Sequence, residues 1–195
     1  ATSNDIVDSA VALQIKDSVE IQITTLKALI ETLCDIAERE RDTIMIGRTH
    51  GQAAVPITFG LKVAVWVDEF RRHIERLVTM RPRITAGKFL GAVGTGAAQG
   101  EDALKLQSLI LQELGLEVPV ATTQVVGRDR YIEWVGWMAN VSTSIEKVLQ
   151  EVRNLQRSEI AEVAEAFDVE KQVGSSTMAH KRNPITAENA CGLAR

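Results

Sequence analysis

The sequence has few of the residues that interrupt helices or build sheets. Its 195 residues include four prolines, four phenylalanines, three tryptophans and one tyrosine. Proline disrupts the interior of a helix, and aromatic side chains favour strands. Because these residues are scarce while Ala, Leu, Glu, Lys and Gln are common, the composition favours helix throughout the chain.

Cysteine and histidine are scarce as well. The two cysteines, Cys34 and Cys191, lie in helical patterns without metal-ligand spacing, and there are only three histidines. This excludes a zinc constellation and predicts two free, buried thiols in a reducing compartment. No apolar run has the length of a membrane span, and no signal peptide is visible. We therefore expect a cytoplasmic protein with no membrane partner.

The charge balance is mildly acidic. A formal net charge of −4 argues against nucleic acid as a partner. With 45% hydrophobic and 25% charged residues, the composition is typical of a globular protein, and 195 residues suffice for one domain with a proper core. The chain starts at Ala1 without an initiator methionine, so we expect a fragment of a longer protein.

Hydrophobic spacing predicts long helices. Between Val19 and Ala37, apolar residues recur in steps of four and three, which is the heptad of a helical bundle. Residues 42–56 are expected to be irregular, apart from a possible short strand at 43–46. The expected helices run from Ser3 or Asn4 to about Arg41, and over residues 57–80, 101–114, 123–167 and 185–195.

Helices of this length constrain the architecture. At 1.5 Å per residue, roughly 25–45 residues would extend about 40–65 Å, which is too long for a compact monomer of this size. We predict an all-α fold in which residues 1–195 form a single domain, an elongated bundle of long antiparallel helices. Its remaining apolar faces should pack against other copies of the chain.

The glycine-rich segment 87–100 lacks the context of a nucleotide-binding motif. It contains Gly91-Ala92-Val93-Gly94-Thr95-Gly96, but no strand precedes it and the spacing does not fit a phosphate-binding loop. We interpret it as a place where helices approach closely or the backbone bends, in preference to a ligand loop.

The segment Gly174–Pro184 contains the densest group of reactive side chains. Glycine and two serines, Ser175 and Ser176, precede the run His180-Lys181-Arg182-Asn183-Pro184. Asn183 can cap a helix that starts at Pro184, and helix N-termini favour anions. The pattern indicates a site for a carboxylate or phosphate, although a solvated loop with unrelated charges is equally compatible.

Two further segments contain candidate residues. Gly47-Arg48-Thr49-His50-Gly51-Gln52 places a histidine in a glycine-flanked loop, where it is accessible and able to transfer protons near neutral pH. A structural or solvated role is the alternative. His73, among arginines on a helix, is expected to face solvent. Thr2-Ser3-Asn4-Asp5 is by itself only a helix-capping sequence.

Together these three segments resemble the signature segments of the fumarase/aspartase superfamily, and they occur in the same order. Gly174–Pro184 resembles the pattern Gly-Ser-Ser-x-Met-Pro-x-Lys-x-Asn-Pro, with Ala179 where proline is usual. The resemblance covers essentially the whole chain and implies the central helical domain of that superfamily. The superfamily's N-terminal and C-terminal domains are not visible in this sequence.

Within the superfamily, the segments are most similar to the adenylosuccinate lyase branch. The shared features are His180-Lys181-Arg182, Thr123-Gln124 followed by Arg128-Asp129-Arg130, Gly91–Thr95 and Thr58-Phe59-Gly60. Argininosuccinate lyases and carboxymuconate cycloisomerases remain alternatives, and His50 distinguishes the latter. A non-enzymatic helical scaffold is the alternative outside enzyme chemistry.

The resemblance implies elimination of fumarate from a small succinyl-nucleotide substrate, without cofactor or metal. It implies Ser175 as the catalytic base and His50 as the general acid, in a site that several subunits of a homotetramer share. Arg130 is a weaker candidate. The implied substrate-binding residues are Thr2, Ser3, Thr49, Gln124, Ser176, Lys181 and Asn183.

Overall fold

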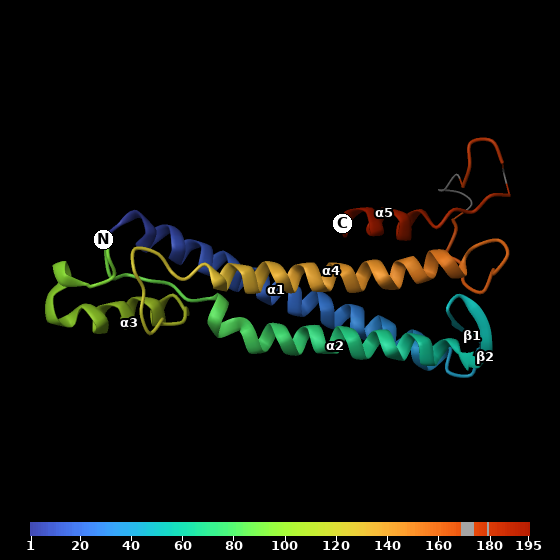
Figure 1. Cartoon of the computed structure of the whole chain (residues 1–195), viewed down its shortest axis with the longest axis horizontal. Helices are drawn as coiled ribbons and strands as arrows, with labels where there is room; N and C mark the ends of the chain where they lie inside the picture. The colour runs from blue at the N-terminus through green and yellow to red at the C-terminus, as the bar shows by residue number, and fades with distance from the viewer. Residues whose placement is uncertain (169–173, 179) are drawn as a thin grey trace. The chain divides into compact units, whose positions relative to one another are not determined.

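The computed structural model describes residues 1–168, 174–178 and 180–195, so Ala179 lies outside the described residues. These residues are mostly helical, and the expected all-α fold class is confirmed. Figure 1 shows the elements in chain order. They are α1 (Ser3–Arg39), β1 (Ile44–Thr49), β2 (Gln52–Thr58), α2 (Phe59–Ile84), the 3-10 helix η1 (Ala97–Asp102), α3 (Ala103–Glu113), α4 (Asp129–Leu155) and α5 (Ile185–Leu193).

The chain divides into two compact units. Unit 1 consists of residues 1–32 and 71–137, and unit 2 of residues 33–70 and 138–195. Helices α1, α2 and α4 contribute residues to both units. The expectation of a single domain over residues 1–195 stays a prediction.

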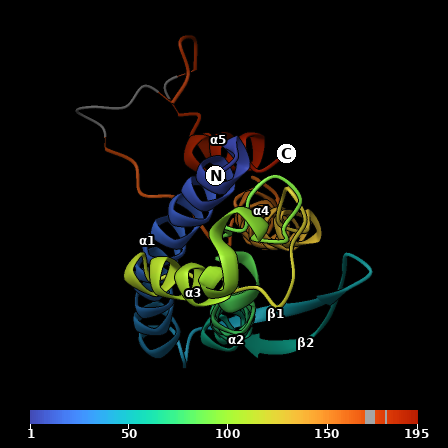
Figure 2. The ribbon, with the colours of Figure 1, turned by 90° about the vertical axis from the view of Figure 1, so that its left-hand side faces the viewer.

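In unit 1, α3 packs against α1 near Ala12 and Leu13. Figure 2 shows α3 in front of α1. The buried contact is formed by Ala12, Leu111 and Leu116, and Leu13, Phe89 and Leu114 pack against it. A Cβ atom at Gly87 would lie 2.6 Å from the Cδ2 atom of Leu111. This glycine lies in the segment that we expected to permit a close approach, and here the expectation is met.

The second half of α2 and the start of α4 also belong to unit 1. The ring nitrogen Nε1 of Trp137 donates a hydrogen bond to the carbonyl oxygen of His73 at 3.0 Å, and Trp134 stacks on Trp137. His73 is 1% exposed. The expectation that His73 faces solvent is therefore wrong, because it lies on the apolar side of α2 and the neighbouring arginines do not.

Unit 2 contains a β-hairpin where an irregular segment was expected. Strands β1 and β2 pair antiparallel, with Thr49 opposite Gln52 and Ile44 opposite Thr58. The possible strand at 43–46 is thus the first part of a longer one. The hairpin joins α2 at Gly60, where a Cβ atom would lie 2.5 Å from the carbonyl oxygen of Ala37, so only glycine permits this approach.

Polar pairs connect the unit 2 part of α2 to that of α4. The Lys62 ammonium binds the Glu151 carboxylate at 2.5 Å, and the Ser144 hydroxyl donates to Glu69 at 2.6 Å. At the end of the chain, the Cys191 thiol donates to the carbonyl oxygen of Glu146 from a buried position on α5.

Several expected boundaries are wrong. Helix α4 runs from Asp129 to Leu155, whereas a helix over 123–167 was expected. The chain leaves the helix after Leu155, and Ala161 adopts a left-handed conformation with φ 52°. Helix α2 continues through Pro82 to Ile84, which is buried, so apolar burial there outweighs the hydrogen bond lost at proline.

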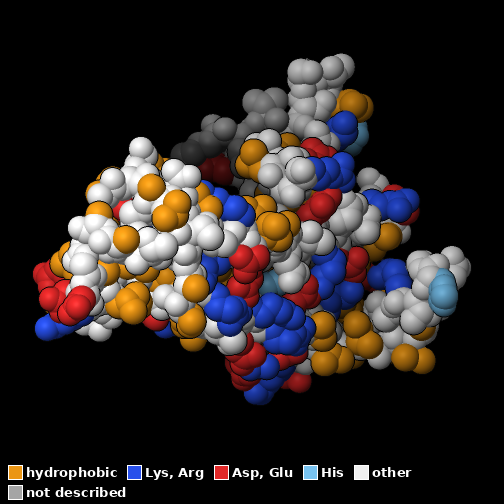
Figure 3. Space-filling view, turned by 60° about the vertical axis from the view of Figure 1, so that its left-hand side comes forward, with side chains coloured by type: hydrophobic (Ala, Val, Ile, Leu, Met, Phe, Trp, Pro, Cys, Tyr) orange, Lys and Arg blue, Asp and Glu red, His pale blue; other side chains and the backbone are white. Residues whose placement is uncertain are grey.

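The surface mixes both signs of charge with apolar side chains, as the face in Figure 3 shows. In unit 1, Arg81 pairs with Glu20 at 2.5 Å and Arg83 pairs with Glu133. Cys34 is exposed, so the expectation that both thiols are buried holds only for Cys191. Among the described residues, none of the helices has the length and apolarity needed to cross a membrane.

Candidate active-site segments

His50 occupies the tip of the β1–β2 hairpin. The two residues of the turn, His50 and Gly51, have φ angles of 53° and 72°, which is the left-handed pair of a type I′ turn. Both His50 and the adjacent Thr49 are exposed. The tight turn therefore fixes the backbone below the imidazole while it leaves the ring accessible.

A bidentate ion pair anchors this hairpin within unit 2. The Arg48 guanidinium donates to both carboxylate oxygens of Glu162, at 2.7 and 2.9 Å. These hydrogen bonds lower the pKa of Glu162 below its ordinary value and raise the pKa of Arg48. The pair thus ties the strand that leads to His50 to the segment that follows α4.

The serine segment forms a turn around the Ser175 hydroxyl. Its Oγ atom accepts hydrogen bonds from the backbone N–H groups of Thr177 and Met178, at 3.3 and 3.2 Å. Ser175 is half-buried, whereas Ser176 is exposed. A hydroxyl oxygen that already accepts two N–H donors lies in an environment that favours negative charge on that oxygen.

Asn183 closes the two ends of this loop. Its side-chain Nδ2 donates to the carbonyl oxygen of Gly174 at 3.1 Å. A Cβ atom at Gly174 would collide with the carbonyl oxygen of Lys181, so glycine is required for the closure. The expected capping role of Asn183 is wrong, because the residue preceding α5 is Pro184 and no side chain of that residue caps the helix.

The N-terminus of α5 is instead occupied by a carboxylate from a distant part of the chain. Glu165 accepts hydrogen bonds from the backbone N–H groups of Thr186 and Ala187, at 3.1 and 2.7 Å. Gln156 supports this arrangement, since its side chain accepts from the Glu165 N–H and donates to the carbonyl oxygen of Arg182. The anion that this helix end attracts is thus an internal one.

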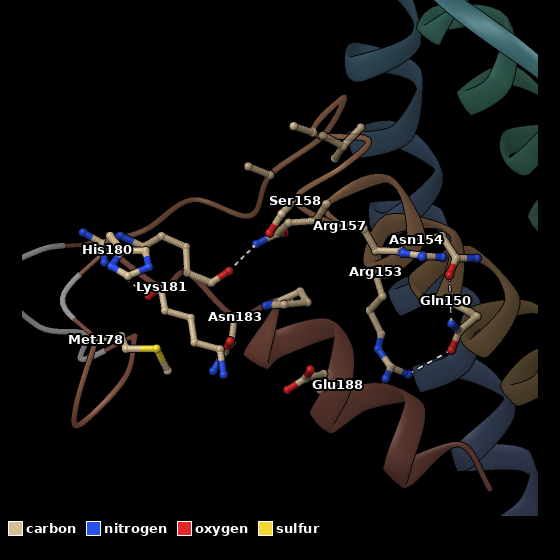
Figure 4. A pocket seen from close by; sticks show the side chains of 16 residues that line it. Gln150, Arg153, Asn154, Arg157, Ser158, Met178, His180, Lys181, Asn183 and Glu188 are labelled. Carbon is tan, nitrogen blue, oxygen red and sulfur yellow. Dashed lines mark hydrogen bonds between the residues drawn. The ribbon is translucent and has the colours of Figure 1, made fainter. Parts of the chain in front are cut away.

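Lys181 and Asn183 line a pocket of about 720 Å³ that lies entirely within unit 2. Figure 4 shows His180 and Lys181 on the loop, Arg153 on α4 and Glu188 on α5 around this pocket. Arg157 and Arg182 also line it. Among the described residues that line it, cationic side chains outnumber the carboxylate of Glu188, which makes the pocket suitable for an anion.

The remaining predicted residues lie in unit 1. Thr2 precedes α1 and is half-buried, Ser3 begins the helix and is exposed, and Gln124 is exposed in the link between α3 and α4. Arg130, the weaker candidate, donates to the carbonyl oxygen of Arg83. Lys181 and Asn183 thus share a pocket, Thr49 and His50 share a turn, and Ser175 and Ser176 do not line the pocket.

Sequence reasoning missed several pocket residues. Arg153, Arg157 and Glu188 are charged residues that line the same pocket as Lys181, yet each lies in an ordinary helical or post-helical pattern. Of these three, only Glu188 could have been anticipated from the sequence, because it lies one turn into the helix that follows the serine loop. In the described part of the chain, no cluster of His, Cys, Asp or Glu has the composition to hold a metal ion.

Comparisons with known proteins agree over the whole chain. A family model described as lyase matches residues 1–195. The adenylosuccinate lyase of Pyrococcus horikoshii is 53% identical over all of this chain, which spans 43% of that protein.

Solved structures of related enzymes also match the whole chain. A fumarate lyase from Mesorhizobium sp. BNC1 is 36% identical with a TM-score of 0.87, and the chain covers 42% of it. A 3-carboxy-cis,cis-muconate lactonizing enzyme from Pseudomonas putida is 35% identical with a TM-score of 0.90, and the chain covers 43% of it. Both match all of this chain, which spans less than half the length of each relative.

Proposed function

Because the chain belongs to the lyase family of the fumarase/aspartase superfamily, we propose that it is the central part of an adenylosuccinate lyase. The observation that carries this proposal is the 53% identity to the Pyrococcus horikoshii enzyme, which extends over all 195 residues. The proposed reaction eliminates fumarate from adenylosuccinate, and from the succinylated carboxamide ribotide, in purine nucleotide biosynthesis. The proposed location is the cytoplasm.

Ser175 is the proposed base. In the elimination, a base removes a proton from the carbon next to a carboxylate, and the negative charge spreads onto that carboxylate as an aci-form. A serine is a poor base unless its alkoxide is stabilised. The two backbone N–H groups that donate to Ser175 Oγ favour the alkoxide. We propose that the positive charge of Lys181 adds to this effect when the loop closes over substrate.

His50 is the proposed general acid. As the carbon–nitrogen bond breaks, the leaving nitrogen takes the electron pair and receives a proton from the imidazole. The exposed hairpin tip suits this role, because a side chain at such a tip can reach into a site formed with another copy of the chain. Thr49 flanks the acid in the same turn.

Lys181 and Asn183 are proposed to hold the succinyl carboxylates. They line a pocket that also contains Arg153 and Arg157, so the developing negative charge would meet several cations. Ser176, Thr2, Ser3 and Gln124 are proposed to contact other parts of the substrate. Closure of the serine loop would exclude water and strengthen these charge interactions.

The proposed assembly is a homotetramer in which the three segments come from different copies. Its support is the set of large apolar side chains that unit 1 leaves exposed on its helices. They are Ile6, Val7, Ile21, Val78, Leu104, Leu106, Leu109, Ile132 and Val135. Exposed apolar residues mark an interaction surface where they form one contiguous patch, and we propose that these residues contribute to such a patch.

One alternative function has a specific observation in its favour. The Pseudomonas putida lactonizing enzyme has the higher TM-score of the two solved structures described above. A cycloisomerase would not need the histidine at position 50, whereas an elimination that protonates a leaving nitrogen does. The presence of His50 on an accessible turn favours the lyase.

The test is an ultraviolet absorbance assay on the full-length protein with adenylosuccinate, argininosuccinate, aspartate, malate and a carboxymuconate. We expect turnover of adenylosuccinate, and the isolated 195 residues should be weakly active or inactive. Turnover of the carboxymuconate instead would establish the alternative.

His50→Asn, which tolerates the left-handed turn, should lower kcat by about 10²- to 10⁴-fold with an unchanged melting temperature. Unchanged kcat would reject the role of His50.

A further inference from the structure

Helix α1 begins with three buried polar side chains on one face. Asp5, Asp8 and Ser9 are 0%, 2% and 3% exposed. Their spacing of three and four residues places them side by side on the helix. Buried polar groups carry a cost unless they are hydrogen-bonded, so the partners of these three residues reveal what the helix holds in place.

Asp5 binds two chain segments at once. One carboxylate oxygen accepts the backbone N–H of Thr2 at 2.8 Å, and the other accepts the N–H of Gly91 at 3.2 Å. The ammonium of Lys88 pairs with the same carboxylate and donates to the carbonyl oxygen of Gly91 at 3.1 Å. Ser9 adds hydrogen bonds to both the N–H and the carbonyl oxygen of Lys88.

These partners also determine the charge of Asp5. Burial raises the pKa of Asp5, but the hydrogen bond from Lys88 and the N–H groups of Thr2 and Gly91 together lower it further than burial raises it. The net pKa is below the ordinary value of 3.8, so Asp5 is ionised at neutral pH. The carboxylate therefore keeps its full acceptor capacity for both backbone segments.

Asp8 holds a third segment, one turn further along α1. Its carboxylate accepts the backbone N–H of Val126 at 2.9 Å and pairs with Arg128 at 3.0 Å. These residues directly follow Gln124 in the link between α3 and α4. The anchor therefore fixes the backbone two residues after Gln124.

The glycine-rich segment that Asp5 binds also contacts the link that Asp8 binds. A Cβ atom at Gly94 would collide with the carbonyl oxygen of Thr122 and would lie 2.9 Å from the Cα atom of Thr123. Gly94 has φ 78°, so both its conformation and its space require glycine. The glycine-rich segment thus packs directly against the residues that precede Gln124.

We propose that Asp5 and Asp8 are positioning residues that hold Thr2, Ser3 and Gln124 together as one substrate-binding edge of unit 1. This rests on the proposed function, which assigns those three residues to the substrate. The aspartates do not touch the substrate themselves. They fix two hydroxyl groups and one amide, which can bind the oxygen atoms of a succinyl-nucleotide by hydrogen bonds.

The hydrogen bonds by which Asp5 and Asp8 hold the three segments are called the clamp here. The variants have to remove the clamp without leaving a buried charge unpaired. Asp5→Asn combined with Lys88→Met removes both charges of the buried pair at similar side-chain volume. Asp8→Ala removes the acceptor of the Val126 N–H and leaves Arg128, whose side chain is half-exposed and can be solvated. The matched control is Leu26→Ala, a buried truncation on α1 that destabilises unit 1 but touches none of the three segments.

The first readout is amide hydrogen exchange in the full-length protein. The clamp variants should exchange about tenfold faster in residues 2–5, 88–96 and 122–128, with little change in α3. The Leu26→Ala control should change exchange around its own site in α1. Unchanged exchange of the three segments in the clamp variants would overturn the proposal.

The second readout is steady-state kinetics with adenylosuccinate. The clamp variants should raise KM about tenfold while kcat changes less than about threefold, and the control should leave KM unchanged. Faster exchange with an unchanged KM would also overturn the positioning role. If the wild-type protein does not turn over adenylosuccinate, the proposed function fails. The hydrogen-exchange result alone then decides whether Asp5 and Asp8 hold the three segments.

Discussion

The candidate segments of the two units are held by different kinds of contact. In unit 1 the N-terminal segment is fixed by Asp5, whose ion pair with Lys88 is 1% and 0% exposed. In unit 2 the hairpin that carries His50 is held by Arg48 and Glu162, whose side chains are 27% and 23% exposed. The ion pair in unit 1 is thus shielded from water, whereas the ion pair in unit 2 is partly exposed to it.

This difference has a physical meaning for a site with moving parts. Breaking a buried ion pair costs several kcal/mol, because it leaves an uncompensated charge, whereas an exposed pair contributes about 0–1 kcal/mol. The hairpin anchor of unit 2, whose side chains are partly exposed, should therefore cost less to break than the buried pair of unit 1. The segments in unit 1 have to keep their geometry.

The largest effect is expected from Lys88→Met alone. The variant leaves the Asp5 carboxylate buried without a counterion, so the free energy of unfolding should fall by about 3–5 kcal/mol. The control is Lys147→Met, because Lys147 pairs with Glu69 from a half-exposed position and should contribute at most about 1 kcal/mol. Urea denaturation measures both, and equal losses would remove the distinction between the two kinds of anchor.

Two glycines with similar backbone angles allow a sharper comparison. Gly94 and Gly51 have φ angles of 78° and 72°, but only Gly94 lacks room for a Cβ atom. Gly51→Ala should therefore cost about 1 kcal/mol through backbone strain alone. Gly94→Ala should cost about 3 kcal/mol, since a collision with Thr122 is added. Thermal melts measure the difference, and a larger loss at Gly51 would contradict it.

The smallest effect is expected from acid at the hairpin anchor. The hydrogen bonds from Arg48 lower the pKa of Glu162 in the folded protein below the ordinary value of 4.5. A lowered pKa contributes stability above the unfolded value, and this stability is lost as the pH falls through the folded value. The protection of the hairpin amides, which is the measured exchange rate compared with the intrinsic rate at the same pH, should therefore decrease as the pH falls below 4.5. In Glu162→Gln this pH dependence should be absent, and its persistence would exclude the ion pair as its cause.

The parts of the fold that depend on local pattern could be predicted. Of the six heptad positions predicted in the first helix, Val19, Leu26 and Leu33 are buried, and the other three, Ile23, Ile30 and Ala37, are half-buried. The hairpin was missed because His50-Gly51 was interpreted as loop chemistry, and because its immediate flanks, Gly47-Arg48-Thr49 and Gln52-Ala53-Ala54, contain few of the β-branched residues that indicate strands. The helix expected over 123–167 continued too far, because the sequence after Leu155 keeps helix-forming residues while its hydrogen bonds turn back to Leu155.

In the candidate site, too, residues in local motifs could be predicted, whereas long-range contacts could not. Ser175, Lys181 and His50 stand out because their motifs are contiguous in the sequence. Asp5 and Lys88 could not be found that way, since 83 residues separate them and Asp5 resembles an ordinary first-turn acid. A contact at that distance becomes visible only when the chain is folded.

The carboxylate of Glu165 at the start of α5 has a consequence for how an anion would reach unit 2. The peptide dipoles of that helix are already neutralised by a resident charge. Long-range steering of a dianion would then come from the arginine and lysine side chains of the neighbouring pocket, and it would weaken with ionic strength as surface charges are screened. Association rates in this region should respond to the cations, and hardly at all to the helix end.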